Sequence, residues 1–115
     1  MSKILIVDDS AVDVQNLQSI LTDAGHLVSV ATSGTEGVSK AKASPPDIIM
    51  MDVNMPGLDG FSAARQLAHD AITKGIPVVF VTGKDQKADR VFAQMLGAKG
   101  FVTKPYTAAQ ILAQL

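Results

Sequence analysis

The stretch LIVDDS, residues 5–10, ends an apolar run with two adjacent carboxylates and a hydroxyl. Similar short apolar runs recur at residues 4–7, 27–31, 48–51, 78–81 and 101–102. Three of these runs are continuous and do not alternate in polarity, which is typical of strands buried on both faces of a parallel sheet. The two acids therefore stand where a buried strand is expected to end.

Amphipathic segments separate the runs, and each starts at a residue type that commonly caps a helix. We expect helices to begin after Ser10, Ser33, Asp59, Asp85 and Thr107. The helix after Asp85 is expected to carry its apolar side chains at Ala88, Val91, Phe92 and Met95. Strands in strict alternation with helices predict an α/β domain with a parallel sheet and helices on both faces.

Composition fits one such domain. The chain has 115 residues, of which 47% are hydrophobic and 18% charged, a globular balance in a length suited to a single core. The net charge of -1 does not favour binding to nucleic acid or to an anionic membrane. The absence of cysteine excludes disulfides, thiolate zinc sites and thiol catalysis. No targeting segment is recognisable, so we expect a cytoplasmic protein.

Polar residues follow the strands at the end where an open α/β sheet binds its ligands. They are Asp8 and Asp9 after the first strand, Asp52 after the third, Thr82 and Gly83 after the fourth, and Lys104 and Pro105 after the fifth. In the strand order 2-1-3-4-5 these strands are consecutive neighbours. Three carboxylates, a hydroxyl and an ammonium would then share one edge.

The chemistry of this group is specific. Three carboxylates a few ångströms apart cannot all ionise without a compensating cation, and Mg²⁺ prefers such oxygen ligands. A carboxylate can also attack phosphorus to form an acyl phosphate, with a metal and Lys104 stabilising the transferred charge. Thr82 could donate to a phosphoryl oxygen, and Gly83 leaves room for it. The turn at Pro56 and Gly57 predicts that Asp52 is exposed at its strand end.

Each residue alone has a simpler explanation, since an aspartate after a strand is usually a helix cap and a lone lysine a solvated charge. Asp47, which precedes a strand, and Asp59, a cap, receive no chemical role. The functional interpretation depends on the coincidence of four strand ends.

The motifs VDDS at 7–10, MDVNMPGLDG at 51–60, VTG at 81–83 and KGFVTKP at 99–105 resemble those of a known family. In this order and spacing they are similar to the receiver domain of two-component response regulators, the CheY-like group, over the full length. The resemblance implies a flavodoxin-like, doubly wound (βα)5 fold and a single receiver domain at 1–115 with no output domain.

The resemblance also implies roles for the acidic residues. Asp52 matches the phosphoacceptor, and Asp9 the acid that binds Mg²⁺ or Mn²⁺ together with Asp52. Asp8 matches an acid that assists through a metal-bound water. Asn54 matches the position whose backbone carbonyl completes the metal site.

The remaining roles concern the phosphoryl group and the switch. Thr82, Gly83 and Lys104 match the positions that contact the phosphoryl group, and the peptide bond between Lys104 and Pro105 is expected to be cis. Thr82 and Phe101 match the switch pair, although phenylalanine lacks the hydroxyl of the tyrosine often found there. Asn54 and Lys84 match positions that tune the lifetime of the acyl phosphate.

We therefore expect a stand-alone response regulator that takes a phosphoryl group from a histidine kinase of the CheA type. It would catalyse only its own phosphorylation and dephosphorylation. The surface formed by the fourth helix, fifth strand and fifth helix would then signal to a protein partner. The segments TGKDQKADRVF at 82–92 and AARQLAHD at 63–70 are similar to single-domain receivers of the pilus twitching-motility chemosensory type. A monomer is expected, and dimerisation on phosphorylation stays open.

Three alternatives remain. The protein could be a phosphate sink that drains a shared kinase. A phosphatase of the haloacid dehalogenase type would need a second acid two residues after the nucleophile, where this chain has Asn54. A flavin- or nucleotide-binding domain would need a glycine-rich or Ser/Thr-rich loop where this chain has DDSAVD at 8–13. Whether Leu115 is the native C-terminus also stays open.

Overall fold

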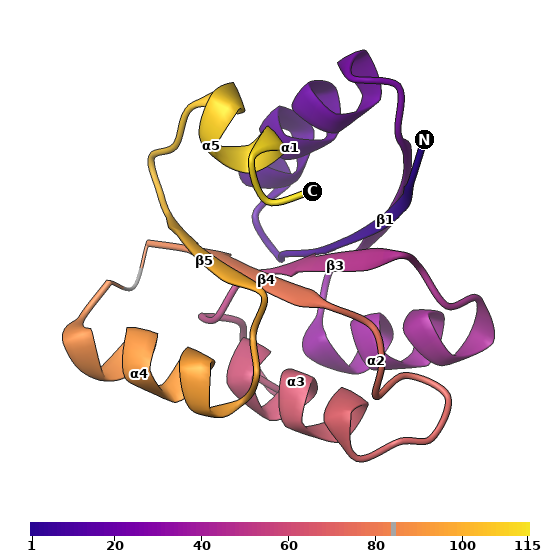
Figure 1. Cartoon of the computed structure of the whole chain (residues 1–115), viewed down its shortest axis with the longest axis vertical. Coiled ribbons are helices and arrows are strands. Elements are labelled where there is room, and N and C mark those ends of the chain that lie inside the picture. Colours follow the sequence, from indigo (N-terminus) through magenta and orange to yellow (C-terminus); the bar gives the residue numbers. More distant parts are fainter. Residues whose placement is uncertain (84) are drawn as a thin grey trace.

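A computed structural model describes residues 1–83 and 85–115, so the predicted tuning role of Lys84 lies outside the described residues. Within these ranges the chain forms five strands and five helices in alternation (Figure 1). They are β1 (Lys3–Val7), α1 (Ala11–Asp23), β2 (Leu27–Ala31), α2 (Gly34–Ala43), β3 (Ile48–Met51), α3 (Gly60–Ala68), β4 (Val78–Thr82), α4 (Lys87–Met95), β5 (Gly100–Thr103) and α5 (Ala108–Leu112).

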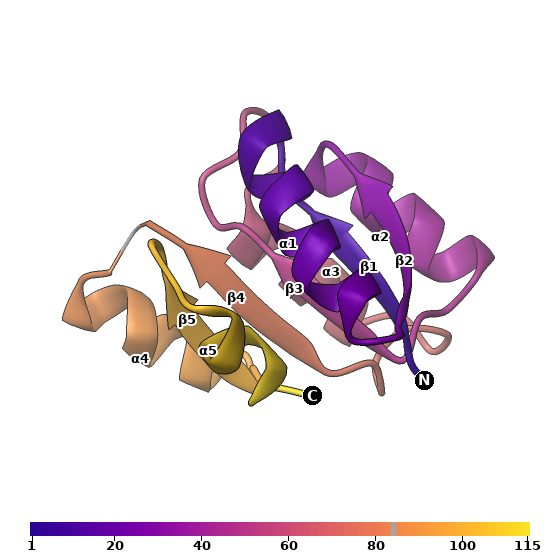
Figure 2. The same ribbon diagram turned by 90° about the horizontal axis from the view of Figure 1, so that it is seen from above.

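The strands form one parallel sheet in the order β2-β1-β3-β4-β5, which confirms the predicted topology (Figure 2). Helices α1 and α5 cover one face, and α2, α3 and α4 cover the other (Figure 1). The strand order reverses between β1 and β3, and doubly wound sheets bind their ligands at such a point, beyond the carboxyl ends of the strands.

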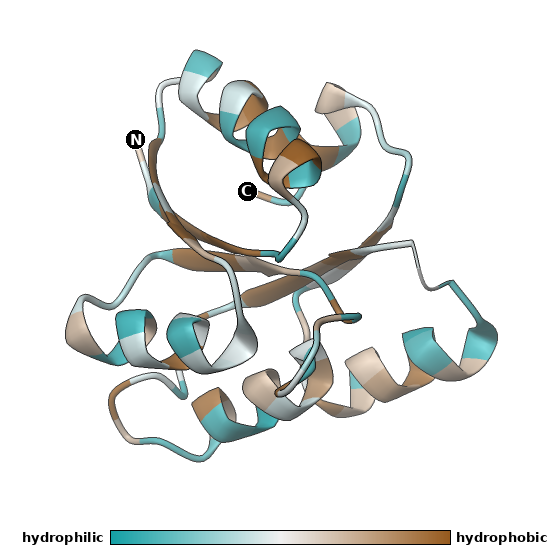
Figure 3. Ribbon diagram, turned by 180° about the vertical axis from the view of Figure 1, so that it is seen from behind, coloured by the Kyte–Doolittle hydropathy of each residue, from teal (hydrophilic) through white to brown (hydrophobic). Residues whose placement is uncertain are grey.

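Alternate residues of each strand face opposite layers, which explains the continuous apolar runs. In β1, Leu5 and Val7 pack in the core that contains residues of α2 and α3, whereas Ile4 and Ile6 pack with α1 and α5. All four side chains are buried. The hydrophobic strands therefore run between two helical layers (Figure 3).

Most of the predicted helix caps are confirmed. Ser10, Ser33, Asp59 and Thr107 each accept a hydrogen bond from a backbone N–H of the first turn. The predicted cap at Asp85 is wrong, because α4 is capped at Gln86. The Asp85 carboxylate instead accepts a hydrogen bond from Arg90, with Oδ1 and Nε 2.5 Å apart.

Helix α4 also packs differently from the sequence expectation. Val91 and Met95 were expected on its apolar side, but they are 46% and 78% exposed. Ala93 is the buried apolar residue, and the Phe92 ring contacts Phe61 of α3 with centroids 4.9 Å apart. At the edge of the sheet α4 has few neighbours, so only a narrow side of the helix is covered.

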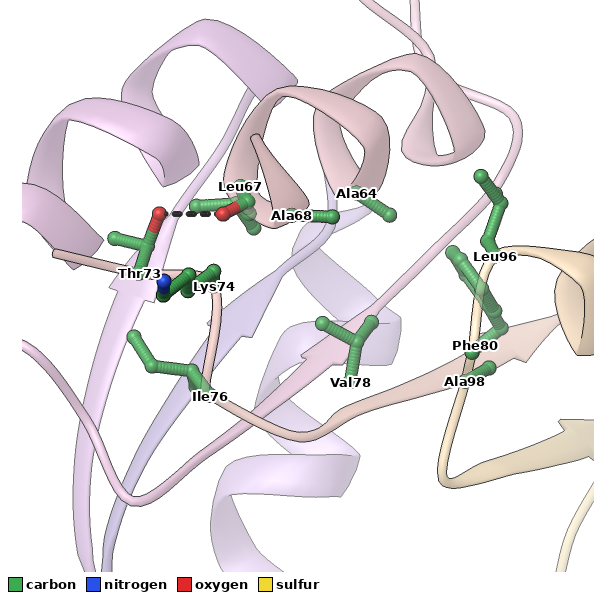
Figure 4. A pocket seen from close by; sticks show the side chains of 11 residues that line it. Ala64, Leu67, Ala68, Thr73, Lys74, Ile76, Val78, Phe80, Leu96 and Ala98 are labelled. Atoms are coloured by element: carbon green, nitrogen blue, oxygen red, sulfur yellow. Dashed lines mark hydrogen bonds between the residues drawn. The ribbon is translucent and has the colours of Figure 1, made fainter. Parts of the chain in front are cut away.

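A small cavity of about 60 Å³ lies at the opposite end of β4 from Thr82. Figure 4 shows it between α3, the segment leading into β4, and Leu96 and Ala98. The Thr73 hydroxyl donates to the Leu67 carbonyl at 2.8 Å and so satisfies the polar group there. A cavity of this volume is well below the size of ordinary ligand pockets.

No helix in the described parts of the chain is long and apolar enough to cross a membrane.

Candidate functional site

Strand register brings the predicted residues together at the carboxyl edge of the sheet. Val7 of β1 pairs with Met51 of β3, and the Asp52 N–H donates to the Val7 carbonyl at 2.9 Å. Asp8 and Asp52 therefore follow neighbouring strands at the same level. On the other side, the Lys104 N–H donates to the Thr82 carbonyl at 2.9 Å, which places the lysine directly beyond β4.

Asp8, Asp9 and Asp52 form the acidic cluster that their positions predict. Each offers a carboxylate oxygen, and these oxygens lie within 4.8 Å of one another. Asp8 and Asp52 are buried, only 4% and 8% exposed, while Asp9 faces solvent. Like charges this close repel strongly, so the site needs a cation.

The expectation that Asp52 is exposed is wrong. The loop after β3 folds inward, with Val53 and Met55 both buried, and the Gly60 N–H donates to the Val53 carbonyl at 2.9 Å. A Cβ on Gly60 would stand 2.0 Å from the Asp52 carbonyl oxygen. The start of α3 therefore approaches the backbone of Asp52 too closely for any side chain.

Lys104 supplies the local positive charge. Its Nζ donates to Asp8 Oδ2 at 2.9 Å and to Asp13 Oδ2 at 2.8 Å, and it lies 3.6 Å from Asp52 Oδ2. Burial opposes the charged form, but the hydrogen bonds to Asp13 and Asp8 and the charge of Asp52 outweigh it, so the pKa of Lys104 is raised. The charged lysine therefore joins Asp8 and Asp13 by hydrogen bonds and lies close to Asp52.

Asp8 has the least favourable environment for a charge. Burial raises the pKa of its carboxyl, and the nearby Asp52 charge adds to the effect. The Ser10 N–H, which donates to Asp8 Oδ1 at 2.9 Å, and Lys104 both act in the opposite direction. The net pKa of Asp8 stays above its ordinary value, consistent with a crowded site that a further cation would relieve.

The other predicted residues surround this cluster. Thr82 is fully buried at the end of β4, whereas Gly83 and Asn54 are exposed. The bond between Lys104 and Pro105 is cis, the isomer that the resemblance implies. Phe101 of β5 is half-buried, and the Arg90 guanidinium carbon lies 4.9 Å from the centre of its ring.

Asp13 is a site residue that the sequence reasoning missed. It lies in the first turn of α1, and Lys104 is the largest influence that lowers the pKa of its carboxyl. No local pattern in the sequence points to this contact, because Asp13 and Lys104 lie 91 positions apart.

The donor set fits a hard divalent cation. The three carboxylates converge and two of them are poorly solvated. Within residues 1–83 and 85–115, the Lys104 ammonium by itself does not balance their charge. Oxygen ligands of this kind suit Mg²⁺ or Mn²⁺. The fold and this site together define an α/β domain that places an acidic cluster suited to a divalent cation beside a lysine.

The chain belongs to the response regulator receiver domain family, which matches residues 4–115. It is 48% identical to the protein PilH of Pseudomonas aeruginosa over 105 residues, which cover 91% of this chain and 87% of PilH. It is 40% identical to the response regulator PleD of Caulobacter vibrioides, but there it spans only 25% of the relative. The chemotaxis protein CheY4 of Vibrio cholerae has a similar structure, with a TM-score of 0.91 and 32% identity over 98% of this chain and 94% of CheY4.

These findings establish the receiver fold and a role in phosphorelay signalling. Receiver domains receive phosphoryl groups from histidine kinases and bind Mg²⁺ in an acidic pocket, and this chain has the corresponding cluster of aspartates. The family is not in itself a family of catalytic enzymes. The haloacid dehalogenase alternative is not favoured.

Proposed function

We propose that Asp52 accepts a phosphoryl group from the phosphohistidine of a histidine kinase. In this step an Asp52 carboxylate oxygen forms the new bond to phosphorus, and the phosphorus–nitrogen bond of the phosphohistidine breaks. The electron pair of that bond stays on the histidine ring. The observation that carries the proposal is the convergence of Asp8, Asp9 and Asp52 beside Lys104 at the edge where strand order reverses.

Asp9, Asp52 and the Asn54 backbone carbonyl would hold Mg²⁺ or Mn²⁺, with Asp8 acting through a water. When bound, the metal neutralises charge on the transferring phosphoryl group. Asp8 suits the indirect role because its carboxylate already accepts hydrogen bonds from the Ser10 N–H and from Lys104. Asp9 suits the direct role because it is the exposed member of the cluster.

Lys104 is the natural partner for the added phosphoryl charge. Its ammonium lies 3.6 Å from Asp52 Oδ2, and a small displacement would bring it into contact with oxygens on phosphorus. We assign Thr82 and Gly83 to the other side of the phosphoryl group. The hydroxyl would donate to an oxygen, and the residue without a side chain would leave space.

The same hydroxyl links the site to the output surface. Phe80 pairs with Phe101 across β4 and β5, and Thr82 lies two residues further along β4. Movement of Thr82 toward Asp52 would leave space that the half-buried Phe101 ring can enter. The surface of α4, β5 and α5 would thereby change its affinity for a protein partner.

We propose that the protein acts in the cytoplasm as a monomeric single domain served by a CheA-like kinase. The similarity to PilH favours a pilus-associated chemosensory pathway. Capture of a non-kinase protein by the phosphorylated form alone would favour an effector. Rapid loss of the phosphoryl group with no such capture would favour the phosphate sink.

Acetyl phosphate tests the proposed chemistry without a kinase. The wild-type protein, incubated with acetyl phosphate and Mg²⁺, should gain the mass of one phosphoryl group in an intact-mass spectrum. Removal of Mg²⁺ by EDTA, or the substitution Asp52→Asn, should abolish the adduct. An unmodified wild-type protein, or an adduct that survives Asp52→Asn, would refute the proposal.

A further inference from the structure

Asp13 contacts the lysine of the site from a helix that carries none of the other assigned residues. Ser10 caps α1 and accepts a hydrogen bond from the Asp13 N–H at 3.4 Å, which fixes Asp13 in the first turn. From there Asp13 Oδ2 reaches Lys104 Nζ at 2.8 Å. The side chain of Asp13 is 35% exposed and that of Lys104 is 16% exposed. The contact is therefore a partly shielded, charge-assisted hydrogen bond.

This bond helps to fix the position of one ammonium group. A lysine has three N–H donors. Asp13 and Asp8 accept from Lys104 at 2.8 and 2.9 Å, but Asp52 Oδ2 lies 3.6 Å away, beyond hydrogen-bond distance. In this arrangement Lys104 is held toward α1 rather than on the carboxylate that would receive the phosphoryl group.

The hydrogen bond to Asp13 also affects the pKa of Lys104. Burial opposes the charge of Lys104, and among the influences that favour the charge the hydrogen bond to Asp13 is the largest. In the same way, Lys104 is the largest influence on the carboxyl of Asp13. Asp13 is thus a main partner of Lys104 in the unphosphorylated site.

We infer that Asp13 is a positioning residue that retains Lys104 in the unphosphorylated arrangement and opposes its movement to a phosphoryl group on Asp52. This inference rests on the proposed function, in which Lys104 pairs with that group. Removing the Asp13 carboxylate would release the Lys104 ammonium from α1 and so favour the phosphorylated arrangement. Asp13 would then set how readily the domain is activated.

A purely structural role for Asp13 makes a different prediction. An acid in the first turn stabilises a helix through its dipole, whatever Lys104 does. Loss of that effect would lower the stability of the fold and leave the preference of Lys104 for a phosphoryl group unchanged. The two roles are separated by a measurement that depends on Lys104.

The test uses beryllofluoride, a phosphoryl analogue that binds without a covalent step, titrated by fluorine NMR at saturating Mg²⁺. Asp13→Asn should bind the analogue about three- to tenfold more tightly than wild type, the range expected for loss of a partly shielded ion pair. Asp13→Glu keeps the carboxylate and should stay within about twofold of wild type. Asp23→Asn removes the same charge at the far end of α1 and should have no effect.

The Lys104→Ala background makes the result decisive. There the gain from Asp13→Asn should shrink by about threefold or more, because the coupling between two contacting residues disappears when one is absent. Equal gains in both backgrounds, or no gain in the presence of Lys104, would overturn the inference. Wild-type protein that fails to bind beryllofluoride would instead refute the proposed function, so the two failures are distinguishable.

Discussion

Asp9→Asn tests whether the acidic cluster is destabilising until a cation binds. The carboxylate oxygens of the cluster lie within 4.8 Å of one another. At that separation two unit charges repel by about 3.5 kcal/mol at an effective dielectric constant of about 20, and by about 0.9 kcal/mol in water. Asp9 is exposed, so the lower value applies to its repulsion with each of the other two acids.

Two such repulsions sum to about 2 kcal/mol, and lost attraction to Lys104 offsets part of this. We therefore expect Asp9→Asn to raise the free energy of unfolding by about 1 kcal/mol in EDTA, measured by urea denaturation. Added Mg²⁺ should stabilise the wild type and have little effect on the variant. Asp23→Asn removes an equal charge outside the cluster, at the C-terminus of α1, and should respond to Mg²⁺ as the wild type does. A lower free energy of unfolding for Asp9→Asn in EDTA, with an unchanged m value, would show that crowding does not govern this site.

Three further changes test other parts of the structure. Gly60→Ala places a Cβ against the Asp52 carbonyl, so the free energy of unfolding in urea should fall by about 2–3 kcal/mol. Acetyl phosphate should also label this variant more slowly, and unchanged labelling would contradict the close approach. In the folded protein the pKa of the Asp8 carboxyl is raised above its ordinary value of 3.8. The stability of wild type relative to Asp8→Asn in EDTA should therefore increase as the pH falls from neutral toward 4. A decrease would mean that the pKa of Asp8 is lowered by folding. Arg90→Ala removes the cation over the Phe101 ring together with the hydrogen bonds to Asp85 and Thr103, and should cost about 0.5–1 kcal/mol in the same urea assay; no change would mean that these contacts together contribute nothing.

The strands and the edge of the sheet were predictable because strands buried on both faces have continuous apolar sequences. The runs at 4–7 and 48–51 appear as strands with at most one added residue at their starts, and their register follows from the parallel order. Since parallel strands end at one edge, the residues after them had to meet. The convergence of Asp8, Asp9 and Asp52 thus follows from topology alone.

The edge helix α4 was harder to predict because tertiary contacts, not local preference, decide its start and its buried side. Asp85 is a good cap by residue type, but its carboxylate pairs with Arg90 and the cap moves to Gln86. Met95 matches a helical apolar spacing, yet it faces solvent because α4 lies at the rim of the molecule. A single sequence carries no signal for either choice.

Two features of the site were also not predictable, because tertiary contacts determine them. Burial of Asp52 depends on how the loop of Val53 and Met55 folds back, which turn residues alone do not specify. The contact between Asp13 and Lys104 joins residues 91 positions apart, so no local pattern reveals it. The spacing of residues in the sequence predicts which strand ends meet, but the partners of individual side chains depend on the three-dimensional structure.

Mapping the phosphorylated residue tests the central claim most directly. Borohydride reduces an aspartyl phosphate to homoserine, so the protein is treated with acetyl phosphate and Mg²⁺, reduced, digested and sequenced by mass spectrometry. We predict homoserine at position 52, and none when Mg²⁺ is withheld. Homoserine at position 8, 9 or 13, or at no position, would contradict the assignment of Asp52 as the phosphoacceptor.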